Sequence, residues 1–313
     1  MVMHISIWLT NPVVKSWNFS EDQKILLEKA LPECTVSLYN DSKSFKANLI
    51  NTDIALVWVF NQNWLEMAPK LKWIATPSAG KDWFNIDAPK EMIITYGAFH
   101  GKIIAENIIG AILGFTRGLH FAGQFQDKYF WPREEIEPYC KTLRGSNLVI
   151  LGFGKIGTWI AKLAKPFGAK ITGVKRTIIK SPEFFDKDDK IITLDELDSV
   201  LPETDHLILA LPRDKTTNDI IDKKKLELLP NRCYIYNIGR GNAINEEDLA
   251  NALNNNSIKG AYLDVFKEEP LDINSPLRNC PNILITPHSS AIAPNFLDLF
   301  IDEFVDRYRK WKN

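Results

Sequence analysis

The stretch that decides the fold runs from Leu148 to Gly157 and reads LVILGFGKIG. Four apolar residues of strand length come first, and glycines at 152, 154 and 157 follow in the spacing GxGxxG. A helical pattern then continues to about Lys165, and Gly168 is placed to end it. We interpret the stretch as a buried strand, a tight turn and the first turns of a helix.

Each glycine of this turn has a physical task if a dinucleotide binds there. Gly152 permits the tight turn, Gly154 lets the backbone approach a pyrophosphate, and Gly157 allows the helix to pack closely on the strand. The helix N-terminus would supply amide donors and a positive dipole to the phosphates. The predicted cofactor-binding turn comprises Gly152, Phe153, Gly154, Lys155, Ile156 and Gly157. An ordinary glycine-rich turn between a strand and a helix is the alternative.

The second strand of this unit ends without the acidic residue that usually accepts hydrogen bonds from the ribose 2′-hydroxyl. No Asp or Glu stands between Gly157 and Glu183. Lys175, Arg176 and Thr177 follow the strand instead. Two cations and a hydroxyl suit a 2′-phosphate, which a carboxylate would repel. We therefore predict NADPH as the preferred cofactor; the alternative is that these cations are merely solvated and the cofactor is NAD.

The rest of the chain alternates short apolar runs of strand length with helical patterns. The runs lie at residues 5–9, 35–39, 54–60, 73–76, 92–95, 148–151, 171–174, 207–211, 234–238, 260–265 and 283–286. This alternation is typical of α/β domains with parallel sheets, and 313 residues are enough for two domains. Ser20 and Gln23 form the sequence pattern of a capping box ahead of a helix, and a last helix begins at about Pro294.

One predicted helix, Ile103–Leu119, is apolar on most of its surface. Such a helix is buried, either between domains or in a subunit interface. The Pro-containing segment 131–139 and the charged segment 181–190 are expected to be surface loops.

Composition and charge exclude several classes of protein. The 38 Lys and Arg residues balance 39 Asp and Glu residues without a basic stripe, so a nucleic-acid partner is not expected. The longest apolar run, Ile54–Phe60, is too short to cross a bilayer, and the first ten residues lack the pattern of a signal peptide. Cys34, Cys140, Cys233 and Cys280 contain no CxxC pair. We expect reduced, buried thiols in a cytoplasmic protein, with no disulfide and no metal site.

Three polar residues follow later strands, where an open α/β sheet places its ligand crevice. Arg240 stands in NIGRG, Glu269 in LDVFKEEP and His288 in TPHSS. Each alone has an ordinary reading, as a solvated Arg, a turn Glu or a structural His. Beside a nicotinamide they suffice for carbonyl reduction, because a guanidinium holds a carboxylate, an imidazolium donates a proton and a carboxylate orients the imidazole.

Taken together, these segments resemble the D-2-hydroxyacid dehydrogenase family. Four characteristic blocks occur in the family's order and spacing, at residues 152–157, 237–241, 263–270 and 286–288. Further similarities are Ala105 and Glu106 in the long helix, Gln126 and Trp131 after it, and Leu211, Pro212 and Thr217. Other dinucleotide binders, such as alcohol dehydrogenases, lack the Arg, Glu and His blocks.

The resemblance implies an α/β architecture of two doubly wound parallel-sheet domains. A Rossmann dinucleotide-binding domain, residues 99–286, would be inserted into a flavodoxin-like substrate domain of residues 1–98 and 287–313. The resemblance also implies a homodimer formed through the long helix and the arm after it, about residues 100–131.

It implies roles for single residues as well. His288 would be the acid in reduction and the base in oxidation, with Glu269 as its orienting partner. Arg240 would hold the substrate carboxylate and carbonyl oxygen. Further cofactor contacts are implied for Leu211, Pro212, Thr217, Ile238, Gly239 and Asp264, the last of these to the nicotinamide carboxamide. The backbone amides of Ser78, Ala79 and Gly80 would bind the substrate carboxylate.

The implied activity is reduction of a 2-oxo acid to the D-2-hydroxy acid with NADPH. The run Lys175-Arg176-Thr177 resembles the glyoxylate/hydroxypyruvate reductase branch of the family. Larger 2-oxo acids remain open, because Trp58, Phe60, Trp64, Trp73 and Trp83 either line a pocket or fill the core. Lys81, Trp83 and Asp214 depart from the family's usual residues. The alternative function is a non-catalytic protein that senses NAD(P)(H).

Overall fold

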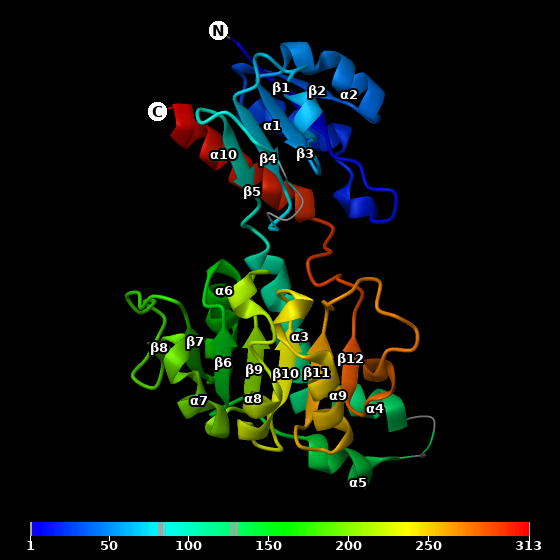
Figure 1. The fold of residues 1–313 in the computed structure, drawn as a ribbon, viewed down its shortest axis with the longest axis vertical. Helices are drawn as coiled ribbons and strands as arrows, with labels where there is room; N and C mark the ends of the chain where they lie inside the picture. The colour runs from blue at the N-terminus through cyan, green and yellow to red at the C-terminus, as the bar shows by residue number, and fades with distance from the viewer. Residues whose placement is uncertain (1, 81–83, 85, 126–127, 129–130, 313) are drawn as a thin grey trace. The chain divides into compact units, whose positions relative to one another are not determined.

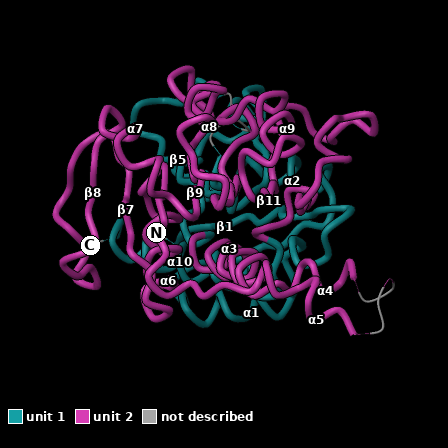
Figure 2. Tube along the Cα trace, turned by 90° about the horizontal axis from the view of Figure 1, so that it is seen from below, with its two compact units in different colours: residues 1–100, 292–313 teal, residues 101–291 magenta. Residues whose placement is uncertain are grey.

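A computed structural model gives the fold shown in Figure 1, and it describes residues 2–80, 84, 86–125, 128 and 131–312. The chain divides into two compact units, Met1–His100 with Ile292–Asn313, and Gly101–Ala291 (Figure 2). The boundaries between the units lie after residues 100 and 291, whereas the domain boundaries predicted from the sequence lie after residues 98 and 286. The C-terminal segment therefore returns to the unit that contains the N-terminus.

Unit 1 is built on a parallel sheet with the strand order β2-β1-β3-β4-β5. Its strands are β1 (Met3–Trp8), β2 (Cys34–Leu38), β3 (Ile54–Val57), β4 (Trp73–Thr76) and β5 (Ile93–Tyr96). Its α-helices are α1 (Glu21–Ala30), α2 (Ser42–Asn48) and α10 (Phe296–Lys312). This order is that of flavodoxin-like sheets.

Hydrogen bonds attach the C-terminal helix α10 to the N-terminal part of unit 1. Gln23 Nε2 donates to Asp298 Oδ1 at 2.7 Å, and the Ala98 amide donates to the Glu303 carboxylate at 3.0 Å. Gln23 also completes the predicted capping box with Ser20 at the start of α1. Gln23 thus helps to cap the N-terminus of α1 and also contacts α10.

Unit 2 is built on a second parallel sheet with the order β12-β11-β10-β9-β6-β7-β8. Its strands are β6 (Asn147–Leu151), β7 (Lys170–Val174), β8 (Lys190–Ile192), β9 (His206–Leu209), β10 (Tyr234–Asn237), β11 (Gly260–Leu263) and β12 (Ile283–Ile285). The direction in which strands are added reverses between β6 and β9. Open α/β sheets bind their ligands at the carboxyl ends of strands beside such a switch point.

Helices cover both faces of this sheet, with α3 and α6 on one face and α7, α8 and α9 on the other (Figure 2). The α-helices of unit 2 are α3 (Gly101–Thr116), α4 (Leu119–Phe125), α5 (Arg133–Ile136), α6 (Lys155–Ala164), α7 (Leu197–Val200), α8 (Lys223–Leu228) and α9 (Glu246–Asn254). Burial on both faces explains why the central strands are continuous apolar runs without alternation. The two parallel sheets confirm the predicted fold class.

The long apolar helix is confirmed as α3, but it ends earlier than predicted. Gly118 has φ +70°, a left-handed conformation that ends the helical run, and α4 begins at Leu119. Ile104, Ile108 and Ile112 of α3 are buried against the sheet, whereas Lys102 and Glu106 are exposed, so the helix buries one face rather than its whole surface.

Two strand assignments need correction. The run 54–60 ends as a strand at Val57, and β8 was not foreseen because it has only three residues after a charged segment. The four cysteines are free thiols, but the predicted burial is found only for Cys233 and Cys280, because Cys34 is half-buried and Cys140 is exposed. Within the described ranges, no helix combines the length and apolar character that a membrane span requires.

Candidate active site

Two glycines of the turn after β6 are required by close packing. Gly152 has φ +101°, and a Cβ atom there would lie 2.5 Å from the carbonyl oxygen of Ala210 after β9. A Cβ atom on Gly157 would lie 2.7 Å from the carbonyl oxygen of Gly152. Neither position can accept a side chain without movement of the backbone, so the turn and the start of α6 stay close to the sheet.

Gly154 is different, because a Cβ atom there would meet nothing within 4 Å. The residue caps α6 with ordinary backbone angles, φ −93° and ψ −153°, and no side chain caps the first turn. Open space above a helix N-terminus, with backbone amides and the positive end of the dipole, fits a pyrophosphate. The residues present therefore fit a dinucleotide, with Gly154, Lys155 and Ile156 in position to hold its phosphates.

The loop after β7 carries the two predicted phosphate-binding cations. Lys175 Nζ reaches the carbonyl oxygen of Phe153 at 3.4 Å, which places it beside the glycine turn. Arg176 is exposed, and its Nη2 lies 3.4 Å from Thr216 Oγ1 and 3.5 Å from Asp214 Oδ2. The loops after β7 and β9 therefore meet through the Arg176 side chain.

The loop after β9 is closed by its own hydroxyl groups. Thr217 is 4% exposed, and its Oγ1 lies 3.0 Å from the Pro212 carbonyl oxygen and accepts from the Asp214 amide at 3.1 Å. Asp214 caps the 3-10 turn Lys215–Thr217 by accepting from the Thr216 amide at 2.8 Å. Thr217 thus shapes the loop, and the structure gives the unusual Asp214 a capping role. In the same loop Leu211 is half-buried and Pro212 is exposed.

Arg240 stands on the loop after β10, and the residues around it fix the path of the backbone. Asn237 Oδ1 accepts from the Gly239 amide at 3.2 Å, and Asn237 Nδ2 donates to the Arg240 carbonyl oxygen at 3.1 Å. A Cβ atom on Gly241 would lie 1.8 Å from the carbonyl carbon of Phe266 after β11. Arg240 Nη1 donates to the Gly239 carbonyl oxygen at 3.0 Å. Ile238 is buried, so only its backbone faces the loop.

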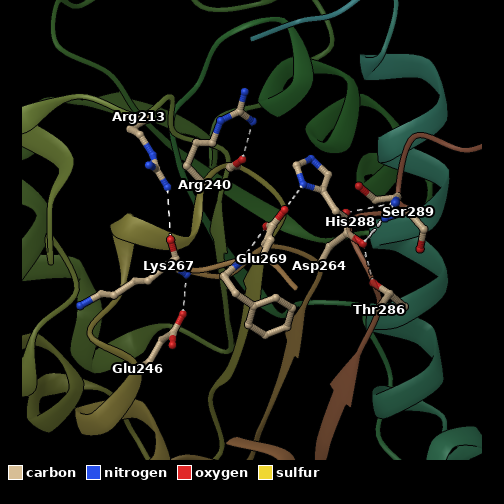
Figure 3. Close-up of polar contacts among 12 residues, drawn as sticks. Arg213, Arg240, Glu246, Asp264, Lys267, Glu269, Thr286, His288 and Ser289 are labelled. Atoms are coloured by element: carbon tan, nitrogen blue, oxygen red, sulfur yellow. Dashed lines mark hydrogen bonds and ion pairs between the residues drawn. The ribbon is translucent and has the colours of Figure 1, made fainter. Parts of the chain in front are cut away.

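Glu269 and His288, two of the three predicted catalytic residues, form a direct pair. His288 Nδ1 lies 2.7 Å from Glu269 Oε2, and Glu269 Oε1 accepts from the Phe266 amide at 3.0 Å. Figure 3 shows the carboxylate and the ring pointing toward each other, with Arg240 on the neighbouring loop. The His288 side chain is 46% exposed. Because Nδ1 is engaged by Glu269, Nε2 is the ring nitrogen left to exchange a proton with a ligand.

Asp264 is fully buried at the end of β11 and holds the loop that carries His288. Its Oδ1 accepts from the Thr286 hydroxyl at 2.6 Å and from the Ser289 amide at 2.7 Å, and its Oδ2 accepts from the Ser290 amide at 3.0 Å. The Asp264 carbonyl oxygen accepts from the His288 amide at 2.8 Å. His288 has φ +51°, a left-handed conformation that a residue with a side chain adopts at a cost. The sequence analysis did not predict that Asp264 holds this loop. The signal that could have indicated it is the pattern of Thr286, Ser289 and Ser290 around His288.

The hydrogen bonds that hold the His288 loop extend to helix α3. The Tyr262 hydroxyl donates to Asn107 Oδ1 at 2.7 Å and lies 2.9 Å from Thr286 Oγ1. Burial raises the pKa of Tyr262 to about 12, so the phenol stays protonated and keeps its donor. The loop before His288 is thereby tied both to β11 and to α3.

The substrate-binding residues predicted from the resemblance lie in unit 1, after β4. Ser78 Oγ donates to the Gly80 carbonyl oxygen at 3.3 Å, Ala79 is exposed, and the Gly97 amide donates to the Ser78 carbonyl oxygen at 2.9 Å. Lys81, Trp83 and Gln126 lie outside the described residues.

Three of the front aromatic residues fill the core of unit 1. Phe60, Trp64 and Trp73 are 3%, 6% and 1% exposed. The half-buried Trp58 stacks on Phe296 with ring centroids 5.9 Å apart. The three buried side chains therefore supply no aromatic lining for a large substrate.

The fold and the site define the class as a nicotinamide-nucleotide-dependent dehydrogenase of the doubly wound type. The family model for the D-isomer specific 2-hydroxyacid dehydrogenase NAD binding domain matches residues 109–290, more than half of the chain. The chain belongs to the D-isomer specific 2-hydroxyacid dehydrogenase family, whose members are oxidoreductases.

Three relatives illustrate the similarity. A glyoxylate reductase of Thermofilum pendens is 31% identical over 240 residues, 72% of this chain and 68% of that protein. A glyoxylate/hydroxypyruvate reductase B of Pectobacterium carotovorum is 28% identical over 235 residues, 73% of this chain and 72% of that protein. The crystal structure of a D-isomer specific 2-hydroxyacid dehydrogenase family protein from Aeromonas salmonicida has a TM-score of 0.80 and 28% identity, covering 99% of this chain and 96% of that one.

The glycine turn gives the first testable prediction. Gly154→Ala should fold normally, because its Cβ atom meets no neighbour, yet bind the dinucleotide at least roughly tenfold more weakly, because that atom enters the space of the pyrophosphate. Gly157→Ala should instead lower the free energy of unfolding by about 1–3 kcal/mol through overpacking. Urea unfolding and fluorescence titration with the dinucleotide measure the two effects, and equal loss of stability in both variants would contradict the assignment.

Proposed function

We propose that the protein reduces a small 2-oxo acid, such as glyoxylate or hydroxypyruvate, to the D-2-hydroxy acid with NADPH, and that His288 is the general acid. The observation that carries the proposal is the 2.7 Å pair between Glu269 and His288, on loops after neighbouring strands of the dinucleotide-binding sheet. Arg240 stands on the next loop of the same sheet edge. A carboxylate, an imidazole and a guanidinium are the groups that carbonyl reduction needs beside a nicotinamide.

His288, Glu269 and Arg240 have separate roles in the proposed reaction. When bound, the reduced nicotinamide supplies the hydride. His288 Nε2 gives its proton to the substrate oxygen as negative charge develops there, and Glu269 stabilises the charged imidazole and fixes the ring through Nδ1. Arg240 binds the substrate carboxylate and stabilises the oxygen electrostatically. The reverse reaction uses neutral His288 as the base.

Other contacts belong to the same proposal. The resemblance assigns the substrate carboxylate to the amides of Ser78, Ala79 and Gly80; the Ser78 amide already donates to Thr76 Oγ1 at 3.2 Å. The resemblance also assigns the nicotinamide carboxamide to Asp264, but this carboxylate is fully buried and both of its oxygens accept from the His288 loop, so we propose that it positions that loop instead. Burial of Phe60, Trp64 and Trp73 within unit 1 supports small substrates over bulky ones.

A panel of 2-oxo acids tests the reaction. Glyoxylate and hydroxypyruvate should be reduced with NADPH faster than a bulky aromatic 2-oxo acid, and His288→Ala should lower turnover by about 10²–10⁴-fold because the proton donor is lost. Arg240→Ala should raise KM as well as lower kcat.

His4→Gln is the matched control for this panel, because it changes a histidine of unit 1 that contacts Ser37 and should leave turnover intact. Unchanged kinetics for His288→Ala would falsify the acid role. Tight dinucleotide binding with no turnover of any 2-oxo acid would favour a non-catalytic NAD(P)(H) sensor.

The cofactor proposal rests on Lys175, Arg176 and Thr177, which follow β7 where an acidic residue is usual. We expect kcat/KM to be higher with NADPH than with NADH, because both cations can pair with the 2′-phosphate. Arg176→Ala should lower kcat/KM for NADPH about tenfold or more and leave that for NADH nearly unchanged, whereas Lys224→Ala, remote on α8, should change neither. A clear preference of the wild type for NADH would remove the assignment.

A homodimer through residues 100–131 is also proposed. Leu119 and Trp131 are 66% and 72% exposed, and Gly110 of α3 has open space around it, so apolar surface and a close approach are both available. Sedimentation at micromolar concentration should give twice the chain mass; a monomer would contradict the interface, and Leu119→Asp should dissociate the dimer.

A further inference from the structure

Asp214 places a carboxylate beside the arginine that we assign to the 2′-phosphate. Asp214 follows β9 and Arg176 follows β7, and these strands flank β6, which carries the glycine turn. Arg176 Nη2 lies 3.5 Å from Asp214 Oδ2 and 3.4 Å from Thr216 Oγ1. The side chain that should meet the phosphate is therefore already paired with an anion of the chain itself.

The Asp214 carboxylate is fixed by the turn that it caps. Its Oδ1 accepts from the Thr216 amide at 2.8 Å and from the Thr216 hydroxyl at 2.7 Å, which leaves Oδ2 toward Arg176. The same hydrogen bonds from Thr216, aided by Arg176, lower the pKa of Asp214, so the group is ionised at neutral pH. The anion cannot swing away from Arg176 without giving up the cap.

Other cations lie near this carboxylate, and two of them contact other groups. Arg213 and Lys215 flank Asp214 in sequence and line a cavity of about 510 Å³ with it, together with Lys267. Arg213 Nη2 is directed to the Lys267 carbonyl oxygen at 3.5 Å, and Lys267 Nζ pairs with Asp219 at 2.7 Å. The ion pair that Asp214 makes in the described part of the chain is with Arg176, at 3.5 Å.

We propose that Asp214 is a specificity-determining residue, whose carboxylate competes with the 2′-phosphate of NADPH for Arg176 and so reduces the preference for NADPH over NADH. The inference rests on the proposed function of Arg176. A phosphate dianion that approaches Arg176 is repelled by Asp214, whereas a neutral ribose 2′-hydroxyl is not repelled and can donate to a carboxylate. Arg176 after β7 therefore favours NADPH, and Asp214 after β9 opposes that preference. On this proposal the protein can use both cofactors.

Asp214→Asn separates the charge from the cap, because Asn keeps an oxygen acceptor for the Thr216 amide and is an equally good capping residue. Titration calorimetry with 2′,5′-ADP and 5′-AMP measures the phosphate contact without turnover. We expect the affinity for 2′,5′-ADP to rise by roughly three- to thirtyfold and that for 5′-AMP to change by less than about twofold. The gain should shrink as salt is added, since both side chains are exposed.

Asp222→Asn is the matched control, because Asp222 caps α8 in the same way, through the Lys225 amide, whereas the Arg176 guanidinium contacts Asp214 and Thr216. It should change neither affinity, and thermal midpoints of both variants should match the wild type. In the double variant Arg176→Ala/Asp214→Asn, the rise in affinity for 2′,5′-ADP seen with Asp214→Asn alone should be mostly lost. The reason is that the arginine for which Asp214 competes is absent.

The outcomes distinguish the two proposals. If Arg176→Ala leaves 2′,5′-ADP affinity unchanged with either residue at position 214, the assignment of Arg176 to the phosphate fails. If Arg176→Ala weakens 2′,5′-ADP binding but Asp214→Asn leaves it unchanged or lowers it, the competing role of Asp214 fails while the NADPH assignment stands. An equal gain in the presence and absence of Arg176 would likewise overturn competition for that arginine.

Discussion

The buried carboxylate of Asp264 fixes the geometry on which the site depends. A buried charge is costly unless hydrogen bonds satisfy it, and here the donors come from Thr286, Ser289 and Ser290 on another loop. Those donors can reach Asp264 only if the loop wraps around it, and the wrapping leaves His288 at φ +51°. The orientation of the imidazole is thus a consequence of satisfying a carboxylate that lies beneath it.

The order of strands then brings separate loops to one edge. β10, β11 and β12 are neighbours in the sheet, so the loops that follow them carry Arg240, Glu269 and His288 side by side. Gly241 packs on the Phe266 backbone, and the Phe266 amide holds Glu269, so the spacing between the first two loops is set by direct contact. The glycine turn after β6 opens at the same edge, because parallel strands all end on one side of the sheet.

Much of this was predictable from local sequence, and the rest was not for identifiable reasons. The Ser20 capping box and the strand before Gly152 depend on residues close in sequence, so their patterns were sufficient. β8 is three residues long and pairs only at the sheet edge, so its two isoleucines gave no periodic signal. The anchoring role of Asp264 depends on donors 22 to 26 residues further along the chain, which no local pattern reports. Asp214 was an unexplained departure until the cap and the ion pair were visible.

The net charge of the chain is close to zero and gives no indication of local charge arrangements such as the Arg176–Asp214 pair. Several ion pairs among the described residues have two exposed partners. Exposed pairs contribute little to the free energy of folding, because water screens them and long side chains lose entropy. The Arg176–Asp214 pair is of that kind, with side chains 72% and 41% exposed, so stability does not account for its importance. The effect that we propose for the pair lies in the potential that a phosphorylated ligand meets as it approaches, because each charge acts over several ångströms. On that proposal Arg176 and Asp214 belong to the cofactor site, since their contribution to folding is small.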